Sequence, residues 1–322
     1  ARLLMAATKG FPNSPSVLAL AGGVGGAKLA LGLALALRPG DLTVCVNTGD
    51  DETFHGLHVS PDLDTMMYTL SGLSNEETGW GVAGDTFTAL EMLGKFGVDT
   101  WFNLGDRDLA THIRRTQLLS DGKTLSEVTD ELNRSLGVTQ IVVPMSDDPV
   151  KTVLATDEGE LPMQRYFVGR RAEPVVSEVR YLGAETASVS PGFQDALTRA
   201  GMLVMCPSNP YLSLGPILAL PAVRQRIRAF PGKKICVSPI VGGDAVKGPA
   251  GKIMAELGKE VSCVQVAREY RDICDVFVMD TQDQALAAEI EELGITPLVT
   301  STIMSTSEDK IALAREILTL AE

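Results

Sequence analysis

Short apolar runs alternate with amphipathic helical patterns along most of this chain of 322 residues. Parallel strands need long crossover connections, usually helices, and these helices cover both faces of the sheet. The alternation therefore predicts the α/β class, with a Rossmann-like, mostly parallel sheet and helices on both faces. The runs expected to form buried strands are Val17–Leu20, Leu42–Val46, Met202–Cys206, Ile235–Val237, Val276–Met279 and Pro297–Val299.

The middle of the chain departs from this alternation. After Asp106, two helical patterns precede three runs with polar residues interspersed, at Ile141–Val143, Tyr166–Val168 and Val176–Tyr181. We therefore expect an inserted α+β subdomain over residues 106–187, within a Rossmann-like nucleotide-binding core formed by residues 17–105 and 188–322. Residues 1–16 lack the apolar region of a signal peptide and are expected to form a loose tail.

Charge and cysteine content narrow the range of partners. The formal net charge of −13 disfavours nucleic acid and anionic membrane surfaces as main partners. No apolar segment approaches the ~18 residues that a membrane-spanning helix needs. The five cysteines include no CxxC pair, so we expect buried, reduced thiols instead of a disulfide framework or a zinc site. These features are typical of a cytoplasmic enzyme that acts on small molecules.

A glycine-rich segment follows the first predicted strand and opens a helical pattern. Its sequence is Gly22-Gly23-Val24-Gly25-Gly26-Ala27-Lys28. The backbone N–H groups and the dipole of a helix N-terminus favour a diphosphate at such a position. The segment lacks the Gly-Lys-Ser/Thr ending of a P-loop, and the next strand ends at Asn47 where an NAD site would usually place an acid. A nucleotide diphosphate is therefore favoured over NAD, and the alternative is a turn that only lets the helix pack closely on the strand.

Four aspartates follow the second predicted strand. Asp50 and Asp51 stand at its end, while Asp62 and Asp64 lie in Ser60-Pro61-Asp62-Leu63-Asp64, a helix start with Ser60 as the expected N-cap. One acid in a first helical turn is explained by the helix dipole alone. Four acids near one sheet edge would repel one another unless a cation offset their charge. Next to a phosphate-binding loop, such oxygen ligands indicate Mg²⁺.

Further polar residues are expected at the same edge of the sheet. Ser208 and Asn209 follow a predicted strand, and carboxyl ends of parallel strands form the ligand site of open α/β folds. The three histidines, His55, His58 and His112, are expected to be contacts at most. Four aromatic residues near the motifs could stack on a ligand or belong to the core: Trp80, Phe87, Trp101 and Phe102.

Taken together, the motifs resemble the 2-phospho-L-lactate transferase family (CofD/FbiA) of coenzyme F-420 biosynthesis. The resemblance runs in family order from residue 17 to the C-terminal part of the chain. It is carried by Gly22–Lys28, Asn47–Asp51, Ser60–Tyr68, Leu104–His112, Pro144–Pro149, Pro207–Pro210 and Val237–Ile240.

The resemblance implies a Mg²⁺-dependent transferase. It would move a phospho-three-carbon-acid group from a guanosine diphosphate donor to the ribityl hydroxyl of the deazaflavin Fo and release GMP. Asp50 and Asp62 match the family's metal-binding acids, and Asp64 matches an acid that binds Fo and could orient or deprotonate its hydroxyl. Asn103 stands where archaeal members place a lysine that contacts the deazaflavin.

The predicted site therefore has a catalytic part, an acceptor part and a donor part. The catalytic part is Asp50, Asp62 and Asp64, and Asp64 with Asn103 would bind Fo. The donor part is Gly22, Gly23, Gly25, Gly26, Lys28, Asn47, Ser208 and Asn209. A homodimer is expected. The competing hypothesis is a non-catalytic metabolic regulator of a related fold that binds a nucleotide sugar. A nicotinamide oxidoreductase is a weaker third hypothesis.

Overall fold

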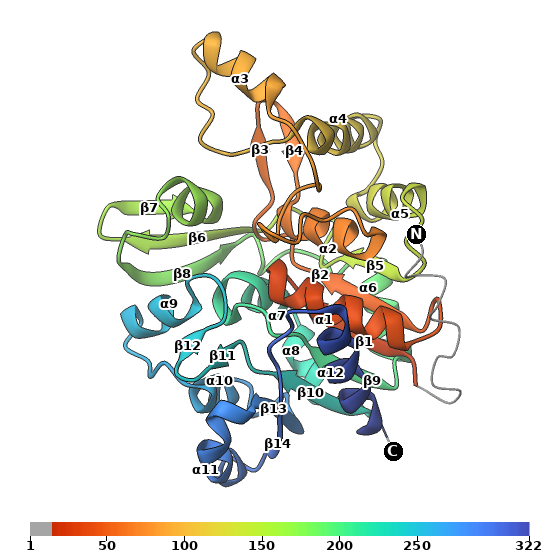
Figure 1. Cartoon of the computed structure of the whole chain (residues 1–322), viewed down its shortest axis with the longest axis vertical. Helices are drawn as coiled ribbons and strands as arrows, with labels where there is room; N and C mark the ends of the chain where they lie inside the picture. The colour runs from red at the N-terminus through yellow and green to blue at the C-terminus, as the bar shows by residue number, and fades with distance from the viewer. Residues whose placement is uncertain (1–14, 322) are drawn as a thin grey trace.

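Seven parallel strands form the central sheet of the computed structural model, which describes residues 15–321 (Figure 1). Their spatial order is β14-β13-β10-β9-β1-β2-β5. The strands are β1 (Val17–Ala21), β2 (Leu42–Val46), β5 (Ile141–Pro144), β9 (Met202–Met205), β10 (Lys233–Val237), β13 (Val276–Asp280) and β14 (Thr296–Thr300). The α/β class and the six expected core strands are confirmed, and the tail expected over residues 1–16 falls almost wholly outside the described residues.

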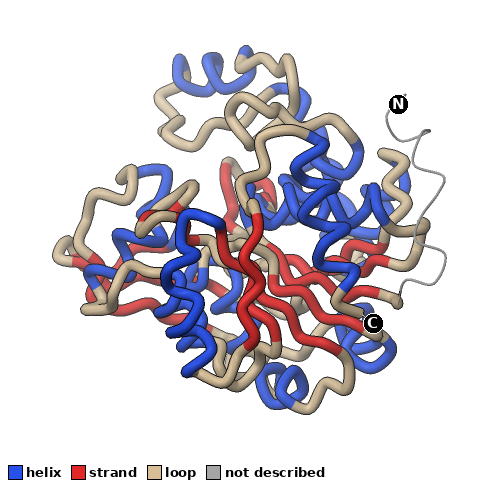
Figure 2. The backbone as a smooth tube through the Cα atoms, turned by 60° about the horizontal axis from the view of Figure 1, so that its bottom comes forward, coloured by secondary structure: helices blue, strands red, loops and turns tan. Residues whose placement is uncertain are grey.

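Both faces of the sheet are covered by helices, which explains why the centres of its strands are mostly apolar (Figure 2). In β1, Val17, Ala19 and Ala21 belong to one hydrophobic cluster, and Leu18 and Leu20 to the other. The helices that contribute to the first cluster are α1 (Gly23–Ala36), α2 (Pro61–Ser71), α5 (Leu125–Ser135) and α12 (Ser307–Thr319). Those of the second are α6 (Pro191–Arg199), α7 (Gly215–Ala219), α8 (Val223–Arg228), α9 (Ala250–Glu256), α10 (Cys263–Glu269) and α11 (Ala287–Glu292).

The order of the strands reverses beside β1. From β1 the chain moves outward to β2 and β5, and it then returns to β9, on the other side of β1. The loops that leave β1 and β9 consequently diverge and open a crevice at the carboxyl end of the sheet. In open α/β sheets, this reversal point is the usual position of a ligand.

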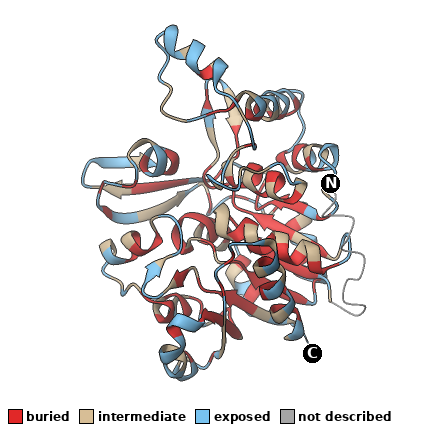
Figure 3. Cartoon of the chain, in the orientation of Figure 1, coloured by how far each residue is buried: buried red, intermediate tan, exposed pale blue. Residues whose placement is uncertain are grey.

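A hairpin connects the first pair of acids to the second. β3 (Glu52–Phe54) and β4 (Leu57–Val59) pair across a two-residue turn, His55-Gly56, in which both residues have positive φ, 52° and 79°. The hairpin returns the chain to the sheet edge, where α2 begins. Beyond it, α3 (Thr88–Lys95) forms a largely exposed arm beside α4 (Asp106–Ser120) at the top of the molecule (Figures 1 and 3).

The segment expected as an α+β insert is divided in the structure. The run at Ile141–Val143 forms β5, which pairs with β2 at the edge of the main sheet, so this part of residues 106–187 belongs to the core sheet. A separate antiparallel sheet contains β6 (Lys151–Thr156), β7 (Gly159–Pro162) and β8 (Val176–Leu182). β8 matches the run expected at Val176–Tyr181. A two-stranded hairpin, β11 (Ile240–Val241) and β12 (Asp244–Ala245), completes the strands.

The run at Tyr166–Val168 forms no strand. These residues form a helical turn, Arg165–Gly169, instead. Tyr166 is fully buried, whereas its neighbours Phe167 and Val168 are both partly exposed. A half-buried strand would place Tyr166 and Val168 on one face and Phe167 on the other. The apolar run is therefore too short for its periodicity to distinguish a strand from a helix. In the structure, the turn directs Phe167 toward the sheet edge.

No helix among residues 15–321 is long and apolar enough to cross a membrane. All five cysteines are buried and free, as the sequence indicated.

The contact between α1 and α12 leads to a stability prediction. A Cβ atom on Gly32 would lie 2.1 Å from the carbonyl oxygen of Lys310, so the two helix backbones cannot accept a side chain there. We expect Gly32→Val to lower the free energy of unfolding by at least about 1–3 kcal/mol, the usual cost of overpacking. Denaturant titration measures the effect, and Ala34→Val in the same helix is the control. Equal stability of the two variants would contradict the close packing.

Candidate active site

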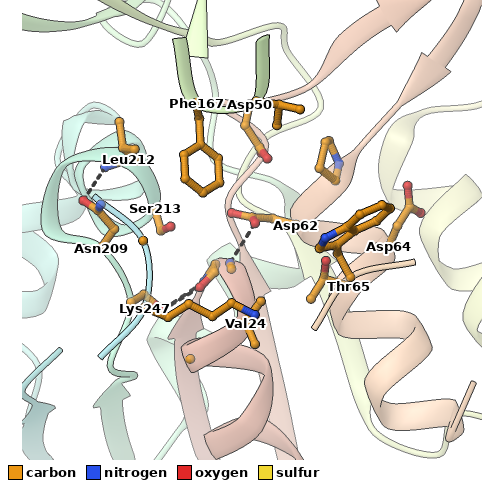
Figure 4. A pocket seen from close by; sticks show the side chains of 18 of the residues that line it. Val24, Asp50, Asp62, Asp64, Thr65, Phe167, Asn209, Leu212, Ser213 and Lys247 are labelled. Atoms are coloured by element: carbon orange, nitrogen blue, oxygen red, sulfur yellow. Dashed lines mark hydrogen bonds between the residues drawn. The ribbon is translucent and has the colours of Figure 1, made fainter. Parts of the chain in front are cut away.

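A pocket of about 480 Å³ opens at the reversal point of the sheet. Its walls come from the start of α1, from α2 and α4, from the Arg165–Gly169 turn, and from the loops after β9, β10 and β14. Of the predicted site residues, all but Gly26 and Asn47 line it. Figure 4 shows Asp50 and Asp62 facing one another at its centre, with Phe167 beside them.

The N-terminus of α1 forms the floor of this pocket. Gly23 has a φ of 63°, which favours glycine, and its N–H donates to the Asp62 carboxylate at 2.7 Å. The Gly22 N–H donates to the Ser208 hydroxyl, which in turn donates to the Gly22 carbonyl. The next two amides, on Val24 and Gly25, have no side-chain acceptor among the described residues. They are the N–H groups that an anion in the pocket could reach.

Two glycines of the loop are explained by packing. A Cβ atom on Gly25 would lie 2.4 Å from the Pro207 carbonyl oxygen, and one on Gly26 would lie 2.5 Å from the Ser208 hydroxyl. A side chain on Gly25 would therefore meet the loop after β9. Gly26 faces the interior and does not line the pocket. The loop after β9 approaches α1 closely because these positions lack side chains.

Asp50 and Asp62 are connected by a single amide. The Asn47 Nδ2 group donates to Asp50 at 3.1 Å and to Asp62 at 2.9 Å. Asp50 also accepts from the Gln164 amide, at 3.1 Å. Asn47 was expected to contact the nucleotide, but it lies buried behind the two acids and holds them together. Both carboxylates thus have neutral partners, and no lysine, arginine or histidine pairs with either among residues 15–321.

The other two acids have cationic or histidine partners. Asp51 lies 2.9 Å from His58 Nε2 and accepts from the Ser60 hydroxyl at 2.7 Å. Ser60 precedes α2 as expected, but its side chain bonds Asp51 and makes no cap. Asp64 forms an ion pair with Arg115, which is also buried. Of the four acids that the sequence grouped, Asp50 and Asp62 are therefore the two without an arginine or histidine partner.

Burial determines how these two acids ionise. Burial, together with the neighbouring Asp62 and Asp51, raises the pKa of Asp50 well above its usual range. Burial also raises the pKa of Asp62 to about 6, against the opposing hydrogen bonds from Asn47 and Gly23. Two charged carboxylates at this position are costly without a cation. The donor set, two carboxylates beside two helix amides, fits a divalent cation that also contacts a phosphate.

A second group of charged residues lies at the wall of the pocket formed by α2 and α4. Asp64, Asp108 and His112 each offer one atom of a type that binds metal ions, and these atoms all lie within 4.8 Å of one another. Arg115 binds both oxygens of Asp64, so a cation at this group would meet a guanidinium. Sequence reasoning missed Arg115. The available signal was the spacing of Asp108, His112 and Arg115, which places all three on one face of a helix.

Two lysines stand beside the start of α1. Lys28 Nζ donates to the Met304 carbonyl at 2.9 Å, and Lys247 Nζ donates to the Thr78 carbonyl at 2.8 Å. Burial and the nearby Lys310 and Lys247 lower the pKa of Lys28. Lys247 was not predicted, and Figure 4 shows it stretched along the pocket near Val24. Asn209, a predicted nucleotide contact, uses its side-chain oxygen to accept from Tyr211 and Leu212 while it lines the pocket.

Aromatic side chains border the pocket near Asn103. Trp80, Phe102 and Phe167 line it, whereas Phe87 and Trp101 do not. Phe102 stacks on Phe54 with ring centroids 4.0 Å apart. Trp80 is 43% exposed and Phe167 is 38% exposed, so each has a face available to a planar ligand.

Comparison with known proteins agrees with this architecture. The family model described as 2-phospho-L-lactate transferase CofD matches residues 17–309. The phosphoenolpyruvate transferase of Kitasatospora aureofaciens is 41% identical over 95% of this chain and 98% of that protein. The 2-phospho-L-lactate transferase of Methanopyrus kandleri is 42% identical over 94% of this chain and 96% of that protein.

A solved structure shares the fold. A Bacillus halodurans protein of the UPF0052 family covers 95% of this chain and 99% of its own with a TM-score of 0.61, at 15% sequence identity. At that identity the likeness concerns the fold alone. The family match and the relatives cover nearly the whole sequence, including every motif of the pocket. The chain therefore belongs to the CofD family of 2-phospho-L-lactate transferases.

Proposed function

We propose that this transferase moves a phospho-three-carbon-acid group from a guanosine diphosphate donor to the ribityl hydroxyl of the deazaflavin Fo. The group would be 2-phospholactyl, phosphoenolpyruvyl or phosphoglyceryl. The ribityl oxygen forms a new bond to the phosphorus that carries the three-carbon acid, the bond from that phosphorus to the GMP oxygen breaks, and the hydroxyl proton is released. GMP is the leaving group. Family membership supports the transferase, and the site geometry supports the placement of donor and acceptor.

One observation carries the placement of the donor. Asp50 and Asp62, which no cation offsets, stand beside the Val24 and Gly25 amides in one pocket. A divalent cation held by Asp50 and Asp62 would neutralise these acids, and the two amides would bind the diphosphate of the donor. Transfer of such a group depends on in-line positioning and charge neutralisation more than on covalent catalysis.

We further propose that Asp50 and Asp62 hold Mg²⁺. Mg²⁺ usually binds through one or two carboxylates together with water and substrate phosphate oxygens, which this donor set allows. When bound, the ion would neutralise charge on the diphosphate and the leaving group. Asn47 would fix the orientation of both carboxylates and Gln164 that of Asp50, because their side-chain amides donate to these carboxylates.

The acceptor would occupy the aromatic end of the pocket. Trp80, Phe102 and Phe167 offer faces or edges to a planar tricyclic ring, and Asn103 offers an amide at the position where the resemblance places a ring contact. Asp64 lies two residues after Asp62 in the first turn of α2, lines the same pocket, and would orient the ribityl hydroxyl. The decisive assay incubates the protein with Fo, Mg²⁺ and each of the three donors and follows the mass of Fo by chromatography. No change of mass with any donor would refute the proposal.

Ligand binding can be tested without turnover. We expect GDP and GMP with Mg²⁺ to raise the melting temperature, because they bind the folded state through the α1 amides. NADH should not, since the residue directly after β2 is Asn47, where an NAD site would usually place an acid for the ribose. Differential scanning fluorimetry at matched ligand concentrations measures both. A shift with NADH and none with guanine nucleotides would overturn the assigned ligand class.

A homodimer working in the cytoplasm is part of the same proposal. The five buried, free cysteines suit a reducing compartment. Sedimentation equilibrium of the purified chain tests the assembly, and a single species at the monomer mass, 34.2 kDa, would exclude the dimer. Nothing in the geometry favours the alternative of a non-catalytic nucleotide-sugar regulator. That alternative leaves the aromatic end of the pocket and the acid pair without a role.

A further inference from the structure

Arg115 lies directly behind the pocket and binds a carboxylate that lines it. The Arg115 side chain is 2% exposed. Its Nη1 group donates to Asp64 Oδ2 at 3.1 Å, and its Nη2 group donates to Asp64 Oδ1. Nη1 also lies 3.4 Å from the His58 carbonyl of β4. Asp64 lines the pocket, and Arg115 does not. The arginine therefore reaches a ligand only through the carboxylate that it holds.

The same guanidinium fixes the tautomer of His112. Arg115 Nη1 lies 3.2 Å from His112 Nδ1. A guanidinium has only donors, so a hydrogen bond between these two nitrogens requires Nδ1 to be the acceptor. In the neutral ring the proton then sits on Nε2, which lies 3.2 Å from Asp108 Oδ1.

Asp108 continues this chain of contacts to another residue of the pocket. It accepts from the Tyr68 hydroxyl at 2.7 Å. Tyr68, Asp108 and His112 all line the pocket. One buried cation thus orders a connected polar wall that runs from α2 to α4.

A gain in folding stability does not by itself explain why the Asp64–Arg115 ion pair is buried here. Apolar residues of the same volume often stabilise a fold as well as a buried pair does, because the pair must be desolvated. What a bidentate pair does provide is direction, since two parallel hydrogen bonds fix the plane of the carboxylate. Here that plane belongs to the acid at the acceptor end of the pocket.

We propose that Arg115 is a positioning residue for the acceptor: it holds Asp64 in the orientation that receives the ribityl hydroxyl and sets which ring nitrogen of His112 carries the proton. The inference rests on the proposed function for the identity of the acceptor. The contacts of Arg115 with Asp64 and His112 do not depend on it.

The kinetic test compares two neighbouring arginines of α4. Arg115→Lys keeps the charge but cannot form the bidentate pair. Arg114→Lys is the matched control, because Arg114 is largely exposed and pairs with Glu131. We expect Arg115→Lys to raise KM for Fo, lower kcat, or both, by about tenfold or more in kcat/KM, as for loss of a charged hydrogen bond. GDP affinity by calorimetry should stay within about twofold, because the nucleotide amides are on another element.

Two kinetic results would overturn the proposal. One is Arg115→Lys behaving like Arg114→Lys in kcat/KM, whatever its melting temperature, which would make the pair purely structural. The other is equal loss of Fo and GDP binding, which would indicate a general collapse of the pocket.

A second measurement needs neither turnover nor a variant of Arg115. The chain has only three histidines, so ¹⁵N-labelled histidine gives a simple spectrum, and His112→Gln assigns the resonance. We expect Nδ1 of His112 to be unprotonated and Nε2 to carry the ring proton. A proton on Nδ1 would exclude the donation from Arg115 and overturn the proposal. If the wild-type protein transfers nothing to Fo, the proposed function fails, while this spectrum still decides whether Arg115 sets the wall of the pocket.

Discussion

Replacing Asp50 or Asp62 with Asn should lower turnover by more than about 100-fold. Mutating a residue that only orients a metal ligand already lowers metal affinity or activity about 10- to 100-fold, and these two acids would be the ligands themselves. Each change removes one charge from the carboxylate pair that would hold Mg²⁺ and leaves the side-chain volume unchanged. The measurement is steady-state transfer to Fo as a function of Mg²⁺ concentration. Part of the activity should return at high Mg²⁺ if the remaining carboxylate still binds the ion.

The control for this prediction is Asp51→Asn. It removes the same charge one residue away, from an acid that already has His58 and Ser60 as partners. We expect Asp51→Asn to leave the Mg²⁺ dependence of the rate nearly unchanged. Near-normal activity of Asp50→Asn or Asp62→Asn at ordinary Mg²⁺ would remove the metal assignment.

The structural role of Asp62 predicts a small, separate effect on stability. Its two oxygens accept from the Gly23 N–H and from Asn47, and an Asn has one oxygen to serve both donors. Asp62→Asn should therefore cost about 1 kcal/mol of stability, the usual value for a lost cap. If Asp62 only caps the helix, Asp62→Asn should show this loss of stability with little effect on turnover. Measuring stability and turnover of the same variant therefore separates a capping role from a metal-binding role.

The core sheet was predictable because its strands are buried on both faces. Val17–Ala21 and Val276–Met279 are apolar throughout, and only a two-sided burial requires that. The position of the pocket followed from the same reasoning, since loops after such strands must meet at one edge. β5 was assigned to the wrong part of the fold because pairing partners are set by topology, which a four-residue run does not encode.

Side-chain partners were the part that sequence could not supply. Four acids near one another suggested a cation, but the partners of Asp51 and Asp64 come from β4 and α4. Only the fold shows that these two are compensated and that Asp50 and Asp62 are not. Asn47 is similar: its place at the end of β2 was correct, yet its amide faces the two acids behind the pocket. Contacts between distant segments carry no local pattern in the chain.

We expect Asp64→Asn to weaken binding of the acceptor and to leave binding of the nucleotide nearly unchanged. Asp64 faces the acceptor end of the pocket, whereas the donor would be held by the α1 amides and the Asp50 and Asp62 pair. We expect Fo affinity to fall about tenfold, as for loss of one charged hydrogen bond, and GDP affinity to stay within a few-fold. Titration calorimetry with Fo and GDP separately, on the same preparation, measures both. Glu308→Gln, an exposed acid in the first turn of α12, is the control for a helix-start charge.

Asn is a better replacement for Asp64 than Ala because Asp64 pairs with the buried Arg115. Asp64→Ala would leave a buried guanidinium without its carboxylate, and breaking such a pair costs about 3–5 kcal/mol, enough to confuse binding with unfolding. An Asn retains one oxygen for Arg115 and tests the charge itself. Equal loss of Fo and GDP would place Asp64 with the metal ligands. No loss of either, with normal turnover, would reduce Asp64 to an acid that stabilises the start of α2, because a helix N-terminus favours a carboxylate without any ligand.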